Sequence, residues 1–224
     1  MNILIVHAHP EPKSFASALK DAAVEELLAG GHHVTVSDLY ALDFDPRLSR
    51  ADFAGQADAG YFKPQREQLQ AAERNSFAAD VQAEMDKVSA ADLVLFTFPL
   101  WWFSLPAILK GWVDRVFAMG FAYGGGKTHE TGPMRGRRAL LALTTGGLAA
   151  SYASGGRNGE LHALLSHIEW GMLDFAGFGV LSPFVAWGPA RATDEERAAM
   201  LGAWRERLRN IEHEAPEPPS PLAG

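Results

Sequence analysis

The sequence predicts a doubly wound α/β domain built on a parallel sheet of five strands. Short apolar runs alternate with helical patterns along the chain, which is typical of parallel strands joined by crossover helices. The run at residues 93–98 is apolar almost throughout, as expected of a strand buried on both faces. We expect the strand order 2-1-3-4-5, with a ligand at the switch point between the first and third strands.

The first half of the chain contains clear starts and stops for these elements. A strand at about residues 2–6 is followed by the loop HAHPEPK, and Ser14 can cap a helix over roughly residues 15–28. Gly30 and Gly31 stop that helix before a second strand at residues 33–37. Residues 38–76 are rich in turn and polar residues and predict a long excursion beside the sheet. A helix at residues 78–90 then precedes the third strand.

The second half repeats the pattern. The helix after the third strand has one apolar face, formed by Leu105, Ile108, Leu109, Trp112 and Val116. A fourth strand is expected at residues 138–144, a helix at about 159–175 and a fifth strand at about 178–186. Thr193 and Glu196 form a capping-box pattern that opens the last helix. The proline-rich tail, residues 214–224, is expected to be extended or disordered.

Composition excludes several classes of function. The 224 residues fit one large domain, and the net charge of −7 gives no general attraction to nucleic acid or anionic membranes. Without cysteine, the chain can form no disulfide, thiolate metal site or cysteine nucleophile. No run approaches the roughly 20 apolar residues of a membrane helix, and no signal-type segment opens the chain. We therefore expect a cytoplasmic protein with no bound metal and no membrane insertion.

The loop HAHPEPKSF is the first of three strand ends that can hold a ligand. Backbone N–H groups at a helix N-terminus bind phosphate, and His7, His9 and Lys13 add possible donors. The loop contains neither the dinucleotide fingerprint nor the nucleotide loop. Taken alone, it equally describes a capped helix with incidental histidines.

The second strand end carries the aromatic segment from Pro99 to Phe103. Trp101 and Trp102 could belong to the core, the usual place of aromatics in an α/β sheet. However, the following helix already supplies a complete buried face. We therefore expect at least one tryptophan at a planar ligand or a subunit interface.

The third strand end is the segment from Thr144 to Gly147. Threonine hydroxyls and glycine N–H groups can approach a planar ligand and stabilise negative charge on it, although a simple turn also explains the glycines. Tyr152 and Asn158 follow in a glycine-rich loop that can fold over this site. The chain has no HExxH pair and no G-x-S-x-G elbow.

Five segments together resemble the NAD(P)H:quinone oxidoreductase (DT-diaphorase) family of flavodoxin-like flavoproteins. They are ILIVHAHPEPKSF, SDLYALDFDP, FPLWWFSLPAILKGWVDRVFAMGFAY, LTTGGLAASYASGG and DFAGFGVL. The resemblance covers roughly residues 2–213 and implies one flavodoxin-like domain over residues 1–213. It further implies tightly bound FAD, which receives a hydride at N5 from a reduced nicotinamide and passes it to a quinone by a ping-pong route. The family also implies a homodimer with shared active sites.

The resemblance assigns roles to individual residues. The FAD pyrophosphate and its surroundings are assigned to His9, Ser14, Phe15 and Ala18. The isoalloxazine is assigned to Pro99, Leu100, Trp102 and Phe103, of which Trp102 and Phe103 also face substrate, and its hydrogen bonds to Thr144, Thr145, Gly146 and Gly147. Asp114 and Arg197 match positions at the adenosine end. Tyr123 and Phe175 match substrate-pocket positions that lie partly across a dimer interface.

Asn158 places the chain nearer to one branch of this family. Tyr152 matches a tyrosine that hydrogen-bonds the reduced flavin, and its partner in the best-known branch is a histidine, where this chain has Asn158. An amide can donate a hydrogen bond to the flavin or substrate but cannot become a cation. The catalytic assignments implied here are Tyr152, Asn158, Gly146 and Gly147.

The ribosyldihydronicotinamide-dependent quinone reductases also carry asparagine there and end soon after the last helix, as EERAAMLGAWRERLRNIEHEAPEP does. The resemblance to this short branch implies weak holding of NAD(P)H. The metal site of that branch includes a cysteine, which this chain lacks. Gly125 stands where the long branch has a second pocket tyrosine, which implies a more open pocket.

Two other functions stay open at this point. One is an FMN-dependent azo- or nitro-reductase, or a general diaphorase, on the same fold. The other is a regulatory flavoprotein subunit of a potassium-efflux transporter. The released flavin separates the first from a quinone reductase, and co-purification with a membrane partner identifies the second.

Overall fold

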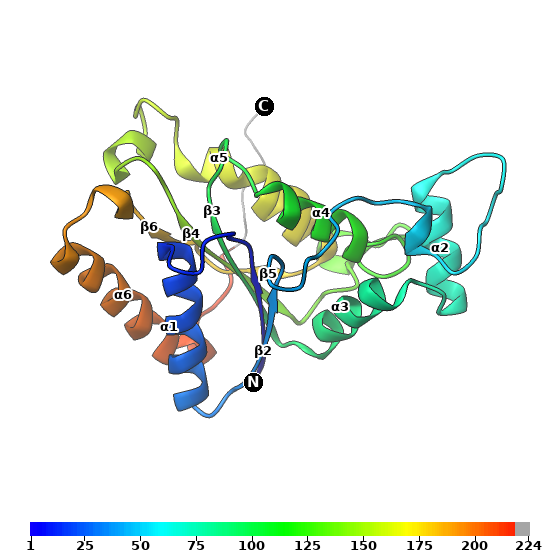
Figure 1. The fold of residues 1–224 in the computed structure, drawn as a ribbon, viewed down its shortest axis with the longest axis horizontal. Helices are drawn as coiled ribbons and strands as arrows, with labels where there is room; N and C mark the ends of the chain where they lie inside the picture. The colour runs from blue at the N-terminus through cyan, green and yellow to red at the C-terminus, as the bar shows by residue number, and fades with distance from the viewer. Residues whose placement is uncertain (218–224) are drawn as a thin grey trace.

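A computed structural model, which describes residues 1–217, shows a parallel sheet with helices on both faces (Figure 1). Its strands follow the order β2-β1-β3-β4-β5, which confirms the predicted topology. They are β1 (Asn2–His7), β2 (His33–Asp38), β3 (Leu93–Pro99), β4 (Arg138–Thr144) and β5 (Gly179–Val180). A further short strand, β6 (Phe184–Ala186), also pairs with β4.

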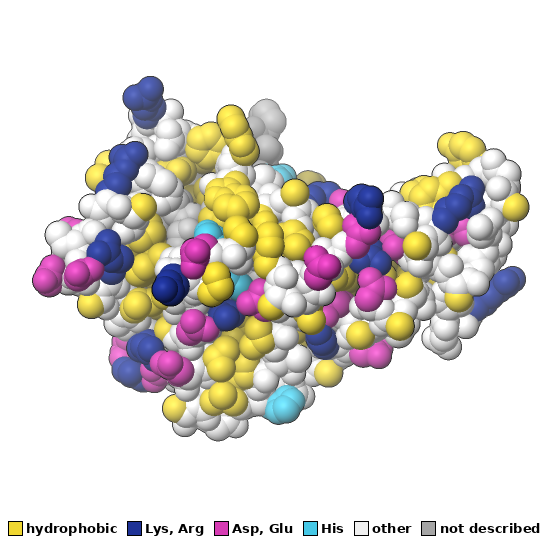
Figure 2. Space-filling model, viewed as in Figure 1, with side chains coloured by type: hydrophobic (Ala, Val, Ile, Leu, Met, Phe, Trp, Pro, Cys, Tyr) yellow, Lys and Arg dark blue, Asp and Glu magenta, His cyan; other side chains and the backbone are white. Residues whose placement is uncertain are grey.

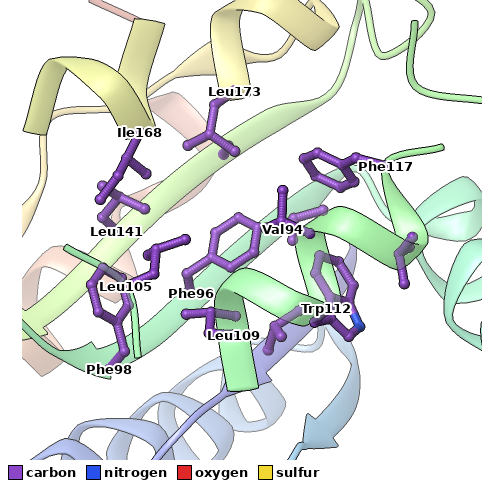
Figure 3. Packing of buried hydrophobic residues seen from close by; sticks show 14 of the residues in the cluster. Val94, Phe96, Phe98, Leu105, Leu109, Trp112, Phe117, Leu141, Ile168 and Leu173 are labelled. Carbon is purple, nitrogen blue, oxygen red and sulfur yellow. The ribbon is translucent and has the colours of Figure 1, made fainter. Parts of the chain in front are cut away.

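Alternate residues of the central strands pack into two separate cores. Leu4 and Val6 of β1 face the core covered by α3 (Ala79–Ala90), α4 (Ala107–Val116) and α5 (Leu161–Ile168). Figure 3 shows this core, in which Phe96 and Phe98 of β3 lie among side chains of α4, β4 and α5. Ile3 and Ile5 face the other core, under α1 (Phe15–Ala29) and α6 (Asp194–Arg209). Burial on both faces explains why these strands are apolar almost throughout.

The helix caps are those that the sequence predicts. The Ser14 side chain accepts the Ser17 N–H at 3.1 Å at the start of α1. At the start of α6, the Thr193 side chain accepts the Glu196 N–H and the Glu196 carboxylate accepts the Thr193 N–H, a complete capping box. Both helices begin where their caps predict, because each cap satisfies a backbone donor that has no partner inside the helix.

The excursion at residues 38–76 contains a helix that the sequence prediction missed. Helix α2 (Pro64–Arg74) begins with proline at its first turn and ends at Asn75 in the left-handed conformation. It stands away from the sheet, at the right of Figure 1. Seven of the eleven residues in its sequence, PQREQLQAAER, are polar, so it lacks the wide apolar stripe by which packed helices are recognised.

Two other predicted elements are divided in the structure. The fifth strand, expected at residues 178–186, is split into β5 and β6 around Pro183, which has no N–H to donate. The helix expected at residues 159–175 is α-helical only over α5 and continues as a π-helical turn from Glu169 to Asp174. β3 also extends one residue further than predicted, because Pro99 still pairs with Thr144.

The beginning of the predicted tail is ordered against β5. The Glu217 N–H donates to the Val180 carbonyl at 2.9 Å, and Pro216 packs against Gly179. Residues 214–217 therefore follow the sheet edge, which agrees with the extended alternative of the prediction for this part. The remainder of the tail, residues 218–224, lies outside the described residues. Within residues 1–217, no helix is long and apolar enough to cross a membrane, and no group of three or more metal-ligating side chains occurs.

Arg115 on α4 anchors the excursion to the rest of the molecule. Its guanidinium is 5% exposed and pairs with Asp52 at 3.1 Å and with Asp80 of α3 at 2.7 Å. It also donates to the Asp45 carbonyl at 2.8 Å and lies over the Phe44 ring. One buried cation thus links α3, α4 and the start of the excursion.

We predict that Arg115→Met destabilises the protein by about 3–5 kcal/mol, because it leaves the buried Asp52 carboxylate without its partner. The matched control is Lys110→Met on the same helix, whose ion pair with Asp114 is exposed and contributes only about 0.5 kcal/mol. Urea denaturation of both variants measures the difference. Equal stability of the two variants would show that Arg115 is not the anchor.

Candidate functional site

A cleft lies at the carboxyl ends of β1, β3 and β4, between the start of α1 and the loops that follow β3 and β4. Its volume is about 790 Å³, within the range of ligand pockets. It sits at the junction of β1 and β3, where the strand order reverses. Figure 2 shows hydrophobic side chains gathered in the upper middle of the view, on the side of the molecule where α1 begins.

One end of the cleft is built to receive negative charge. The backbone N–H groups of Phe15 and Ala16 open α1 and find no acceptor among residues 1–217. Lys13 and Arg197 line the same cleft. His9 accepts the Glu11 N–H at its Nδ1, at 3.0 Å, so its Nε2 carries the ring proton. Free amides at a helix N-terminus beside two cations favour a phosphate group, even though the whole chain is acidic.

The aromatic segment forms a strained turn at the middle of the cleft. The Ser104 N–H donates to the Trp101 carbonyl at 3.0 Å, and the two central residues, Trp102 and Phe103, have φ of 53° and 57°. Asparagine and glycine are the usual residues of such a turn. An L-residue in this region costs about 1–2 kcal/mol, and strain of this kind is concentrated at functional sites.

Neighbouring side chains hold this turn in place. Ser104 Oγ lies 2.9 Å from His167 Nε2 of α5, and the Phe103 ring meets Tyr152 edge-on at 6.4 Å. Trp102 is 95% exposed and Trp101 is 41% exposed, and both line the cleft. The prediction that the two tryptophans are not both in the core is confirmed.

The third strand end brings two hydrogen-bond donors together. A Cβ atom at Gly147 would lie 3.0 Å from the Tyr152 ring and 3.3 Å from Asn158 Nδ2, so any larger residue would crowd these two side chains where they converge. The Asn158 N–H donates to the Ser151 carbonyl at 2.8 Å, which fixes the loop. Gly146 faces open space beside them. The hydroxyl and the amide can therefore act together on a ligand over Gly146.

Most of the predicted cofactor residues meet in the cleft. Those lining it are His9, Ser14, Phe15, Ala18, Pro99, Leu100, Trp102, Thr144, Thr145, Gly146 and Arg197. Phe103, Gly147, Tyr152 and Asn158 adjoin it through the contacts described above. The lining also includes Ala16, Trp101, Pro189 and Ala190, which the sequence prediction did not assign. For the last two, the Gly-Pro step after β6 was an available signal, because such steps mark turns at strand ends.

Asp114 does not meet Arg197 within one chain, so their shared assignment at the adenosine end stays a prediction. Asp114 lies with Tyr123 and Phe175 in a second pocket of about 270 Å³, which shares no lining residue with the cleft. The reason is topological, because α4 and α6 cover opposite faces of the sheet. A residue-by-residue resemblance does not show which chain supplies each contact.

The sequence suggests His7 as a possible ligand donor. The structure instead buries it behind the cleft. It is 1% exposed and its ring lies between Thr97 of β3 and Ser17 of α1. Burial lowers the pKa of the imidazole from 6.5 to about 4. Asp38 acts in the opposite direction, and Lys20 and His9 lower the pKa of His7 further. The ring is therefore neutral near pH 7.

Comparison with known proteins gives a consistent result. A family model described as a flavodoxin-like fold matches residues 1–208. Ribosyldihydronicotinamide dehydrogenase (quinone) of Homo sapiens is 46% identical over 217 residues, or 96% of this chain and 94% of that protein. NAD(P)H dehydrogenase (quinone) 1 of Cavia porcellus is 42% identical over 95% of this chain and 78% of that protein. A crystal structure from Klebsiella pneumoniae, described as a candidate quinone reductase, has a TM-score of 0.93 and 39% identity, covering 96% of this chain and 86% of the other.

The strain at Trp102 predicts an unusual effect of glycine. We expect Trp102→Gly to be about 1 kcal/mol more stable than Trp102→Ala, because both remove the exposed ring but only glycine relieves the left-handed backbone. Thermal and urea denaturation of the two variants measure this difference directly. A more stable alanine variant would show that the turn is not strained at this residue.

Proposed function

The chain belongs to the flavodoxin-like family of NAD(P)H- and ribosyldihydronicotinamide-dependent quinone dehydrogenases, and we propose that it reduces quinones by two electrons with bound FAD. The observation that carries this proposal is the order of groups along one cleft. A phosphate-binding helix start, an aromatic turn and a pair of hydrogen-bond donors follow one another from β1 to β4. A ligand with a phosphate and a flat, electron-accepting ring fits this order.

The residues present suit a flavin at this place. The start of α1, with Lys13 and Arg197, would hold the phosphates, and the strained turn with Thr144–Gly147 would hold the ring. When bound, the flavin supplies the redox chemistry, by hydride uptake at N5 from a reduced nicotinamide and delivery to a quinone in ping-pong order. The protein supplies orientation and charge stabilisation. Tyr152 and Asn158 are the donors available to stabilise negative charge on the reduced ring.

The extent of the cleft favours FAD over FMN. Besides the start of α1 and the strand ends, the cleft is lined by Pro189, Ala190 and Arg197 at the N-terminal side of α6. FMN ends at its phosphate, whereas FAD extends past it into an adenosine. The resemblance assigns Arg197 to the adenosine end, and its place in the same lining as the start of α1 supports the longer cofactor.

The separation of the two pockets supports a homodimer with shared sites. Asp114, Tyr123 and Phe175 form their pocket apart from the cleft, yet the family assigns them to the same ligands. A second copy of the chain would bring one protomer's pocket against its partner's cleft. Trp102, which is 95% exposed in the single chain, would then be covered at the interface. We propose that each protomer is one domain over residues 1–213. The cytoplasmic location also stays a prediction.

The experiment that tests the function is the spectrum of the purified chain. We expect a yellow protein that releases FAD and whose bound flavin is bleached anaerobically by NADH or by dihydronicotinamide riboside, then reoxidised by a quinone. Comparison of the two donors identifies the preferred one. Release of FMN would indicate an azo- or nitro-reductase or a diaphorase instead. A colourless protein that takes up no flavin would refute the flavoenzyme proposal.

Tyr152 gives a sharper test of the donor pair. We predict that Tyr152→Phe slows flavin reduction about 10- to 100-fold, since a hydrogen bond to a charged group contributes roughly 1.5–3 kcal/mol. The matched control is Tyr61→Phe, which removes the hydroxyl of an exposed tyrosine in the excursion. Stopped-flow reduction of the holoenzymes measures both rates. An unchanged rate in Tyr152→Phe would remove this residue from the catalytic assignment.

A further inference from the structure

His7 is a buried polar side chain that the proposed chemistry does not use. It ends β1 and joins two other elements through both of its ring nitrogens. Its Nδ1 lies 2.8 Å from Thr97 Oγ1 of β3, and its Nε2 lies 3.1 Å from Ser17 Oγ of α1. Because a buried polar group needs partners, these two contacts fix the ring between the centre of the sheet and the first turn of α1.

The neighbouring hydroxyls determine which nitrogen of His7 carries the proton. Ser17 Oγ donates its proton to the Glu11 carbonyl at 3.0 Å. Ser17 Oγ must therefore accept from His7 Nε2, so the proton of a neutral ring lies on Nε2 and Nδ1 accepts from the Thr97 hydroxyl. A protonated ring would lose this acceptor. The lowered pKa of His7, about 4, agrees with a neutral ring despite the raising effect of Asp38.

The same network continues to the cleft through Ser14. Ser14 Oγ accepts the Ser17 N–H and lies 2.9 Å from Ser17 Oγ. Since the Ser17 proton is used at Glu11, the Ser14 hydroxyl donates its one proton to Ser17 Oγ, and this contact fixes the Ser14 side chain at the start of α1. Ser14 lines the cleft next to the N–H groups of Phe15 and Ala16, which have no acceptor in the described part of the chain. The chain of hydrogen bonds therefore runs from Thr97 through His7 and Ser17 to Ser14.

We propose that His7 is a positioning residue for the phosphate-binding start of α1. By donating to Ser17 and accepting from Thr97, it holds the Ser14 hydroxyl and the adjoining loop in the geometry that a phosphate requires. This inference rests on the proposed flavin site and deepens it, because the ligand group concerned is the phosphate of the flavin nucleotide. His7 does not touch the ligand and acts through Ser14.

A comparison of ligands with and without phosphate tests the proposal. The full chain, freed of flavin, is titrated with FAD, FMN and riboflavin while its tryptophan fluorescence is followed. His7→Phe removes both hydrogen bonds and keeps a ring. We expect it to weaken FAD and FMN binding about tenfold, the effect of one hydrogen bond to a charged group, and to leave riboflavin binding within about twofold.

Coupling to Ser14 supplies the second readout. Ser14→Ala should weaken binding of FAD and FMN as well. The double variant should bind them no more weakly than the worse single variant, because both changes disrupt the same hydrogen-bond network. The matched control is Ser37→Ala on the neighbouring strand β2, which deletes a buried hydroxyl that accepts from Lys87 at 3.0 Å. This variant should bind all three ligands like the wild type. Equal losses for riboflavin, unchanged FAD binding in His7→Phe, or additive losses would each overturn the proposal.

Nitrogen NMR of the imidazole gives a result that is independent of flavin binding. We expect the Nε2–H tautomer at pH 7 and a neutral ring still at pH 5.5, since the pKa of His7 is about 4. An Nδ1–H tautomer or a cationic ring would overturn the inference even where FAD binds. If the wild-type chain takes up no flavin, the proposed function fails and this inference fails with it. If the wild type binds FAD and His7→Phe binds it equally well, only the role of His7 is refuted.

Discussion

The parallel pairing of β1 with β3 is the constraint on which the site depends. The two strands are in register from Ile3 and Leu93 to His7 and Thr97, at the centre of a sheet buried on both faces. From the end of β1 the chain turns to α1 on one face, and from the end of β3 it turns to α4 on the other. The chain therefore leaves this edge of the sheet in opposite directions, and a cleft opens between the two connections. The predicted phosphate contacts at the start of α1 and the aromatic turn after β3 border this gap, and the end of β4 adds Thr144–Gly147 beside it.

The junction also explains why polar and strained groups occur together with a large apolar core. The ends of two buried strands must satisfy their side chains without water, and Thr97, His7 and Ser17 do so by bonding one another. Next to them, the backbone at Trp102 and Phe103 adopts left-handed conformations that neither residue favours. The surrounding packing stabilises this turn, through the Ser104–His167 and Phe103–Tyr152 contacts. Packing in the core therefore offsets the cost of a strained turn that exposes aromatic side chains.

Local signals in the sequence predicted most of the fold and much of the site, and long-range contacts account for the rest. Ser14 and Thr193 locate helix starts because a cap acts within three residues. The cleft residues were predictable because parallel strands end at one edge. Helix α2 was missed because its polar sequence carries no periodic apolar signal, and the separation of Asp114 from Arg197 depends on which face each helix covers. His7 could not be placed, since its partners are 10 and 90 residues away in the chain.

The electrostatics of the cleft show why net charge is a poor guide to its ligand. The chain carries −7 overall, yet the start of α1 offers N–H groups that find no acceptor within residues 1–217, beside Lys13 and Arg197. Arg197 is held by the Pro189 carbonyl and by Asp194, which orients its guanidinium without filling the cleft. Backbone amides carry no titratable proton, and the neutral ring of His7 adds no charge behind them. The anion-binding end thus depends on fixed dipoles more than on mobile charges, and its preference for phosphate should persist across the pH range in which the fold itself is stable.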